Sequence, residues 1–270
     1  MKKILSLLLL SIILISCSKT ATQTDLIPIH DNFTLESQYV NETRVINVWM
    51  PEEFKTKDTW LPVIYMPDGG IKEDFPHIAN TISKLIKNKT IPPIILVGVE
   101  NTKRGRDLTG PSEVKEDAQY CPLTDGAKNF RNFFTEELFP EINKRYRTTK
   151  EKGIIGESLA GLFVMETFLL KPETFDFYIA VDPSLWWNNH YLEKNTKKYL
   201  KALPKTPTKL WFAGSSAQDI SVHTNKIAET MKTQAPETLI WHYSEESDEK
   251  HNTIFRATKE KALTWALNKN

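Results

Sequence analysis

The sequence predicts an α/β protein built on a mostly parallel, eight-stranded sheet with helices on both faces. Strand-like and helix-like segments alternate from Leu61 onward, which is the pattern of a parallel sheet crossed by helices. The run 94–99 is apolar throughout, as expected of a strand buried on both faces. The 270 residues are 40% apolar and 26% charged, without an internal repeat or a change of composition. We therefore expect one domain, residues 25 to 270, around a large core.

The predicted elements follow one another in a regular order. Polar and apolar residues alternate over 44–50, which is typical of an outer strand. Strands are expected at 33–39, 44–50, 61–66, 94–99, 152–156, 177–181, 209–213 and 238–243. Helical periodicity predicts helices at 75–88, 127–146, 159–170, 191–203, 220–234 and 252–267. Pro140 predicts a kink or break within 127–146, because proline lacks a backbone N–H.

Charge and cysteine content argue against two classes of protein. The 35 Lys and Arg residues nearly balance 34 Asp and Glu residues, giving a net charge of +1. A nucleic-acid-binding protein normally carries a basic excess, so we expect no nucleic-acid partner. The 2 cysteines are too few for a disulfide scaffold or a thiolate zinc site.

The N-terminus predicts export. A basic start, Met1-Lys2-Lys3, precedes the apolar segment 4–15, which is too short to span a bilayer but suits a signal peptide. Ser16-Cys17 follows this segment. The junction resembles the bacterial lipobox, where the cysteine takes lipid and becomes the new N-terminus. We expect a lipoprotein signal peptide at 1–16, a lipidated tether at 17–24 and a domain anchored by lipid to a membrane of the bacterial cell envelope. The alternative is an ordinary signal peptide with an incidental cysteine.

The segment 153–161 predicts a catalytic serine. It reads as strand, sharp turn and helix, with small residues two places before and after Ser158, namely Gly156 and Ala160. A nucleophile elbow needs such residues because its strained turn brings backbones close together. The alternative is that Ser158 only caps the following helix.

A serine nucleophile needs a base and an acid. Of six histidines, His251 follows the last predicted strand, from where a side chain can reach over the sheet to Ser158. The acid that orients this base should follow the sixth or seventh strand. Asp219, after the seventh, is our first choice, and Asp182, directly after the sixth, is the alternative.

An acyl-transfer site also needs N–H donors for the oxyanion. We expect the backbone N–H of Leu159 as one and that of Gly70 as the other, with Gly69 as an alternative to Gly70. A plain glycine turn is the competing explanation for the two glycines. Serine chemistry of this kind requires no metal or organic cofactor.

The segment 100–125 is long, charged and without clear periodicity. A loop of this length in a compact domain usually has a function. It leaves the carboxyl end of a strand, where parallel sheets bind ligands, so we expect it to shape the substrate site.

With these motifs, the chain resembles the putative-esterase branch of the α/β-hydrolase superfamily, particularly its siderophore-esterase-like and esterase D-like members. Tyr-Met-Pro-Asp-Gly at 65–69 is similar to the family's Tyr-Leu-Leu-Asp-Gly. The segment 104–109 matches Arg-x-Arg-Asp-Leu-Thr, 155–163 matches the elbow, and 182–187 matches Ser-Pro-Ser-Leu-Trp-Trp. Three positions depart from the pattern: Glu157 replaces a usual histidine, Gly110 is inserted before Pro111, and Asp182 replaces a serine.

The resemblance implies an α/β-hydrolase fold and a serine ester hydrolase acting on a small-molecule or glycan ester. Siderophore-type esters are the first expectation for the substrate, and feruloyl or acetyl esters of polysaccharides are the second. A catalytically inactive binding lipoprotein and an acyltransferase are further alternatives. Planar guanidinium groups could hold an anionic or catecholate substrate, and indole rings could form an aromatic wall, so the expected substrate contacts are Arg104, Arg106, Trp186 and Trp187.

Overall fold

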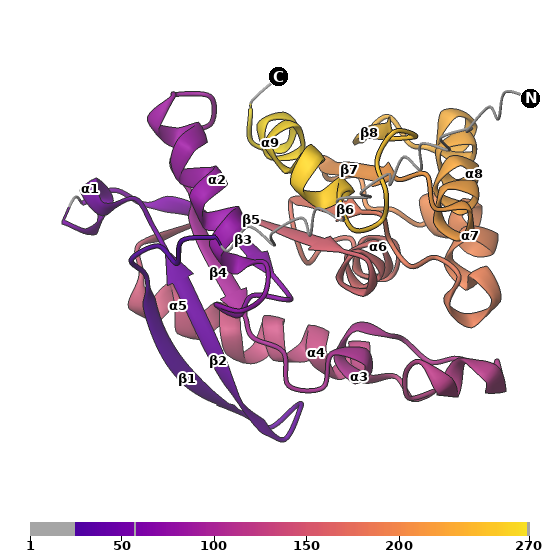
Figure 1. Cartoon of the computed structure of the whole chain (residues 1–270), viewed down its shortest axis with the longest axis horizontal. Coiled ribbons are helices and arrows are strands. Elements are labelled where there is room, and N and C mark those ends of the chain that lie inside the picture. Colours follow the sequence, from indigo (N-terminus) through magenta and orange to yellow (C-terminus); the bar gives the residue numbers. More distant parts are fainter. Residues whose placement is uncertain (1–24, 57, 269–270) are drawn as a thin grey trace, which may run out of the picture.

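The computed structural model describes residues 25–56 and 58–268, so the predicted signal peptide, Cys17 and the tether lie outside the described part of the chain. The eight strands form one sheet in the order β1-β2-β4-β3-β5-β6-β7-β8 (Figure 1). Their bounds are β1 Asp31–Ser37, β2 Glu42–Trp49, β3 Leu61–Met66, β4 Ile95–Val99, β5 Thr148–Glu157, β6 Phe177–Val181, β7 Thr208–Gly214 and β8 Leu239–Glu245.

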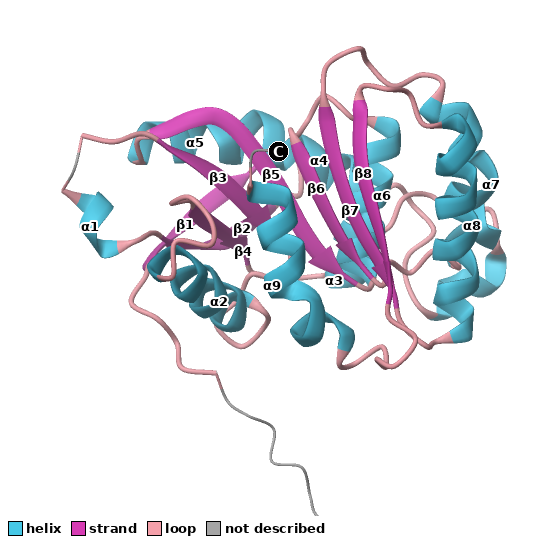
Figure 2. Cartoon of the chain, turned by 90° about the horizontal axis from the view of Figure 1, so that it is seen from above, coloured by secondary structure: helices cyan, strands magenta, loops and turns pink. Residues whose placement is uncertain are grey.

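The sheet is mostly parallel. Only β1 and β2 pair antiparallel to their neighbours, and β3 to β8 all run in the same direction. The carboxyl ends of β5 to β8 therefore lie along one edge of the sheet (Figure 2). Strands β4 and β6 are buried along their whole length, which explains their continuous apolar sequences. The predicted fold class, a mostly parallel eight-stranded α/β-hydrolase sheet, is confirmed.

Helices cover both faces of the sheet, as predicted (Figure 2). Apolar residues of α2 and α9 pack with strand residues in one core, and those of α4 to α8 pack with strand residues in the other. The helices are α1 Glu52–Lys55, α2 Phe75–Lys87, α3 Arg104–Leu108, α4 Gly126–Asn132, α5 Phe139–Arg145, α6 Leu159–Leu170, α7 Trp187–Leu200, α8 Gln218–Gln234 and α9 Ile254–Leu267. Within the described residues, no helix is long and apolar enough to cross a membrane.

Two predictions change in detail. Between α4 and α5 the chain forms a π-helical segment, Phe133–Leu138, and Pro140 occupies the first turn of α5. A first-turn proline needs no intrahelical acceptor for the N–H that it lacks, so the helical run continues past it. The segment 100–125, expected to be irregular, contains α3 and a 3₁₀ turn, Lys115–Gln119.

Candidate active site

Ser158 lies on a strained turn between β5 and α6. Its φ of 59° and ψ of −119° are unusual for a residue with a side chain. The Ser158 N–H donates to the Val181 carbonyl at 3.0 Å, which ties the turn to β6. A Cβ at Gly156 would lie 2.7 Å from the Ala160 backbone, so only glycine fits there. The local sequence thus builds the geometry of a nucleophile elbow.

His251 lies between Ser158 and a carboxylate. Its Nε2 is 3.1 Å from Ser158 Oγ, and its Nδ1 is 2.6 Å from Asp182 Oδ2. The three residues come from the turns after β5, β6 and β8. An imidazole held by a carboxylate on one nitrogen can accept a proton from a hydroxyl on the other.

The carboxylate that contacts His251 is Asp182, so the choice of Asp219 is corrected. Asp182 is fully buried and accepts hydrogen bonds from the N–H and hydroxyl of Ser215 at 2.7 and 2.8 Å. Asp219 is exposed in the first turn of α8. The physical reason is sheet order: β6 is the neighbour of β5, so a residue that directly follows β6 lies beside the Ser158 turn.

The charge around His251 favours its protonated form. The hydrogen bond to Asp182 raises the pKa of His251, burial opposes this, and Glu157 and Asp219 add weaker attraction. Glu157, next to the nucleophile, is mostly buried, and this burial together with nearby carboxylates raises its pKa to about 7. A carboxyl group that titrates near pH 7 therefore immediately precedes Ser158 in the chain.

The predicted oxyanion donors are only partly available. Leu159 opens α6, so its N–H has no intrahelical acceptor and lies beside Ser158. The Gly70 N–H instead donates to Glu73 Oε2 at 2.7 Å, and the Gly69 N–H donates to the Val99 carbonyl at 2.9 Å. Both glycine donors thus have internal acceptors, Glu73 within the loop after β3 and Val99 at the end of β4. Gly70 can serve an oxyanion only when Glu73 releases it.

The two arginines that were predicted to contact substrate differ in how their guanidinium groups are paired. All three guanidinium nitrogens of Arg106 are paired. Nε donates to Asp107 at 2.7 Å, and the two Nη atoms donate to Glu42 at 2.8 and 3.0 Å. This pairing lowers the pKa of Glu42 to about 2. The role of Arg106 in this structure is to hold the loop, which differs from the predicted substrate contact.

Arg104 is anchored but partly accessible. Its Nε and Nη2 each contact one oxygen of Asp68 at 2.7 Å, a planar two-point pairing. The side chain remains 37% exposed, and Glu157 acts on it electrostatically, which places it on the Ser158 side of the loop. A contact between Arg104 and substrate stays a prediction.

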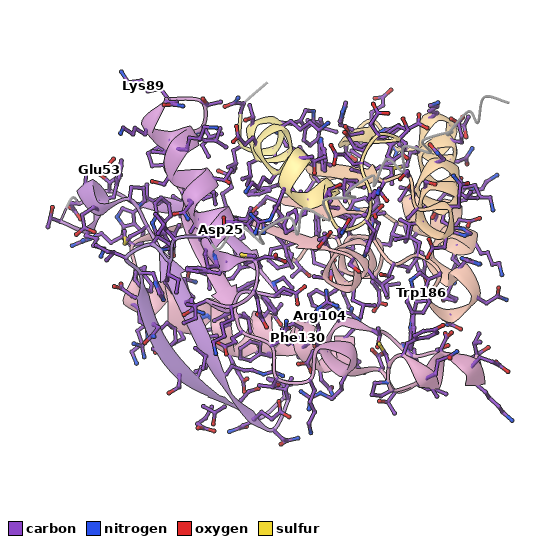
Figure 3. The ribbon with its side chains drawn as sticks, in the orientation of Figure 1. Asp25, Glu53, Lys89, Arg104, Phe130 and Trp186 are labelled. Atoms are coloured by element: carbon purple, nitrogen blue, oxygen red, sulfur yellow. The ribbon has the colours of Figure 1, made fainter. Side chains whose placement is uncertain are left out.

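The two tryptophans also separate. Trp187 is buried and donates from Nε1 to the Gly110 carbonyl at 3.0 Å, so it packs the loop onto α7 rather than facing substrate. Trp186 is half-buried, and its ring meets the exposed Tyr120 edge-to-face at 5.1 Å between centroids. Arg104 and Trp186 are both labelled in Figure 3, Arg104 at the start of α3 and Trp186 at the start of α7.

Sequence reasoning gave no role to three residues of this site. The Ser184 hydroxyl is 3.4 Å from Ser158 Oγ, Ser215 holds Asp182, and Glu73 occupies the Gly70 N–H. The sequence carried a signal for only one of them, since Ser184 belongs to the segment 182–187. Ser215 and Glu73 lie in turns of ordinary composition and reach the site only through the fold.

Comparison with known proteins decides the family. The model of the family described as putative esterase matches residues 37–266. The chain belongs to the putative esterase family. It is 28% identical over 249 residues to the ferri-bacillibactin esterase BesA of Bacillus subtilis, covering 84% of this chain and 86% of that protein. This family membership makes the chain an ester hydrolase.

Solved structures of hydrolases have the same fold. An IroE-like serine hydrolase from Shewanella oneidensis superposes with a TM-score of 0.78 at 27% identity, over 88% of this chain and 79% of that one. The siderophore hydrolase EstB from Aspergillus nidulans gives a TM-score of 0.76 at 19% identity, over 90% and 95% of the two chains. The second likeness, at this identity, concerns the fold alone.

Proposed function

We propose that this ester hydrolase acts through a Ser158–His251–Asp182 triad on siderophore-type esters. The observation that carries the triad is the continuous line of hydrogen bonds from Ser158 Oγ through the imidazole to the buried Asp182. Each member of the triad follows a different strand. A backbone hydrogen bond to Val181 holds Ser158 in place, and a hydrogen bond from Ser215 holds Asp182.

The geometry supports acyl transfer in two halves. Ser158 Oγ attacks the ester carbonyl while His251 Nε2 takes its proton, and Asp182 stabilises the imidazolium through Nδ1. The carbonyl oxygen becomes an oxyanion that the Leu159 N–H stabilises. When the carbon–oxygen bond to the leaving group breaks, His251 returns the proton to the departing alcohol.

Water completes the reaction. His251 takes a proton from a water molecule, the hydroxide attacks the acyl-enzyme, and Ser158 Oγ leaves with a proton from His251. His251 can act as the base in either half of the reaction only as neutral imidazole. Its raised pKa therefore predicts that activity falls as pH decreases through that pKa.

Two features support a siderophore-type substrate. Relatives with this fold include a ferri-bacillibactin esterase and a siderophore hydrolase. Arg104 offers an anchored guanidinium, and Trp186 with Tyr120 offers aromatic edges, which suits a ring-bearing, anionic ester.

The proposal includes a lipid anchor on Cys17. Support comes from the sequence alone, namely the short apolar segment that ends at Ser16-Cys17. The lipid would hold the enzyme on a membrane of the bacterial cell envelope. Expression with a labelled fatty acid tests this: the wild type should incorporate label and Cys17→Ala should not, and equal labelling of both would refute the anchor.

Activity tests separate the candidate functions. The purified chain should hydrolyse p-nitrophenyl acetate and react with a fluorophosphonate at Ser158, and failure of both would refute the serine esterase. A panel of catecholate trilactones, feruloylated sugars and acetylated xylan then assigns the substrate. Preference for the polysaccharide esters would contradict the siderophore assignment while leaving the triad intact, and product formed on an added alcohol would identify a transferase.

A further inference from the structure

A cluster of two histidines and one glutamate joins α7 to α8, outside the Ser158–His251–Asp182 line. His190 and Glu193 lie three residues apart in α7, and His223 comes from α8. One ligand atom from each residue lies within 4.8 Å of the other two. We propose that His190, Glu193 and His223 form a binding site for a divalent transition-metal ion.

The donor set defines the class of ion. Two imidazole nitrogens and one carboxylate are ligands for Zn²⁺ and, in the same combination, for Fe²⁺. Ca²⁺ and Mg²⁺ prefer oxygen ligands alone, so this cluster does not suit them. Three protein ligands leave one tetrahedral position for water or another small ligand.

One imidazole nitrogen of the cluster lacks a partner. His190 Nδ1 is buried and has no hydrogen-bond partner, which is costly for a polar atom. His190 and His223 stack with ring centroids 3.8 Å apart and planes inclined by 17°. A metal ion would satisfy the unpaired nitrogen.

The backbone positions His190 at a conformational cost. Asn188, Asn189 and His190 are consecutive residues with positive φ, at 48°, 51° and 61°. Such a run is strained for residues with side chains and needs support from its surroundings. Asn188 supplies it, since its N–H donates to Asp117 at 2.9 Å and its Oδ1 accepts from the Glu113 N–H at 3.1 Å.

Metal binding requires a small rearrangement. The His223 Nδ1 now hydrogen-bonds to the Glu193 carboxylate, and Lys226 pairs with the other oxygen of Glu193 at 3.4 Å. Ligands of a tetrahedral Zn²⁺ lie about 3.3 Å apart, given metal–ligand distances near 2.0–2.1 Å. Any separations in the cluster that approach the 4.8 Å limit must therefore contract, while the hydrogen-bonded His223–Glu193 pair must open. Side-chain rotation can supply this contraction, and the metal replaces the proton between His223 and Glu193.

The expected consequence is a cross-link between two helices that pack against each other. An ion that binds only the folded chain raises its stability by mass action. At about a hundredfold excess of metal over the dissociation constant, the melting temperature should rise by roughly 5–10 °C. The site is independent of the proposed catalytic function, because it shares no residue with the triad.

The test uses the full chain without a histidine tag, stripped of metal by a chelator. Titration with ZnCl₂, and with Fe²⁺ under anaerobic conditions, is followed by calorimetry and thermal unfolding. We expect one equivalent of one of these ions to bind and to raise the melting temperature. Co²⁺ should give the visible absorption of a tetrahedral site.

Matched variants locate the ion. His190→Ala, His223→Ala and Glu193→Gln should each weaken binding at least about tenfold, whereas His242→Ala, at an exposed histidine on β8, should not. His251→Ala should also keep binding, which separates this site from the catalytic residues. The absence of one-equivalent binding by the wild type, or unchanged binding by the double variant His190→Ala/His223→Ala, would overturn the proposal.

Discussion

The turns after β5, β6 and β8 and the loop between β4 and α4 form the same site by different means. In the turns, backbone geometry places the side chains: Ser158 and Asp182 both have positive φ, and each N–H is bonded to the neighbouring strand. In the loop, ion pairs place the side chains. Asp107 pairs with the buried Arg44 at 2.6 Å, and Arg106 pairs with Glu42.

We expect this difference to separate chemistry from recognition. A short turn fixed by its backbone holds reacting atoms within a few tenths of an ångström, which proton transfer requires. A long loop fixed by side chains can change its shape by exchanging a few ionic partners, while the catalytic turns stay as they are. We therefore expect substitutions in the turns to lower kcat and substitutions in the loop to act on stability and KM.

The largest expected effect is the loss of the nucleophile. Ser158→Ala should lower kcat/KM by at least about 10³-fold, because it removes the hydroxyl that the strained turn holds against His251. Circular dichroism and melting temperature should match those of the wild type. The nearby Ser184, 3.4 Å away, offers a control: Ser184→Ala should retain most activity. Equal loss in both variants would contradict the assignment of Ser158.

The acid comes next. Asp182→Asn should lower kcat by about 10²–10⁴-fold, since an amide at this position removes the charge that stabilises the imidazolium. Asp219→Asn is the matched control and should change kcat less than twofold, because that side chain is exposed and acts on His251 only at long range. Comparable losses in the two variants would show that the hydrogen bond between His251 and Asp182 does not account for the loss of kcat.

The loop should respond in stability. Asp107→Ala leaves Arg44, which is fully buried, with only Glu42 at 3.3 Å, and should cost about 3 kcal/mol of unfolding free energy. Chemical denaturation measures this cost. In the remaining folded enzyme we expect a raised KM with kcat within a few-fold of the wild type. A selective loss of kcat would break the division between loop and turns.

Glu73 should restrain the reaction. Its carboxylate accepts the Gly70 N–H, so Glu73→Ala should raise kcat by about two- to tenfold if Gly70 then serves the oxyanion. Burial raises the pKa of Glu73, which agrees with a carboxylate in a poorly solvated position. Steady-state kinetics with p-nitrophenyl acetate measures the change. A lower kcat would mean that Glu73 orders the loop after β3 instead of blocking it.

The smallest effect concerns pH. The charge of Glu157 helps to raise the pKa of His251, so Glu157→Gln should move the acid limb of kcat/KM to lower pH by less than about one unit. The pKa of Glu157 itself rises from 4.5 to about 7 on folding. The folded chain therefore holds this proton more tightly, and the stability that Glu157 contributes is lost as pH rises from 4.5 to 7. Glu157→Gln should accordingly melt higher than the wild type at pH 8, but not at pH 4.

Several parts of the site were readable from the sequence because local rules fix them. Gly156 and Ala160 around Ser158 predict a turn that only small neighbours permit, and the structure shows that turn. The position of His251 after the last strand was predictable because parallel strands bring their carboxyl ends to one edge. Strand boundaries followed from apolar runs such as Ile95–Val99.

Other parts depended on partners that are distant in the sequence. Arg106 was predicted to contact substrate, but Glu42, 64 residues away, takes its guanidinium. Gly70 was predicted as a free donor, but Glu73 accepts its N–H. Spacing cannot distinguish a free polar group from a paired one, because pairing depends on which side chains the fold brings within 3 Å.

The sequence by itself determined three features: the succession of strands and helices along the chain, the strained turn at Ser158, and the histidine after the last strand. Each of them depends on residues within a few positions. Only the tertiary structure decided between Asp182 and Asp219. That choice rests on β6 lying next to β5 and on Ser215 holding the buried carboxylate toward His251. The physical reason is that hydrogen bonds form between neighbours in space, and sheet order, which sets those neighbours, is a property of the whole fold.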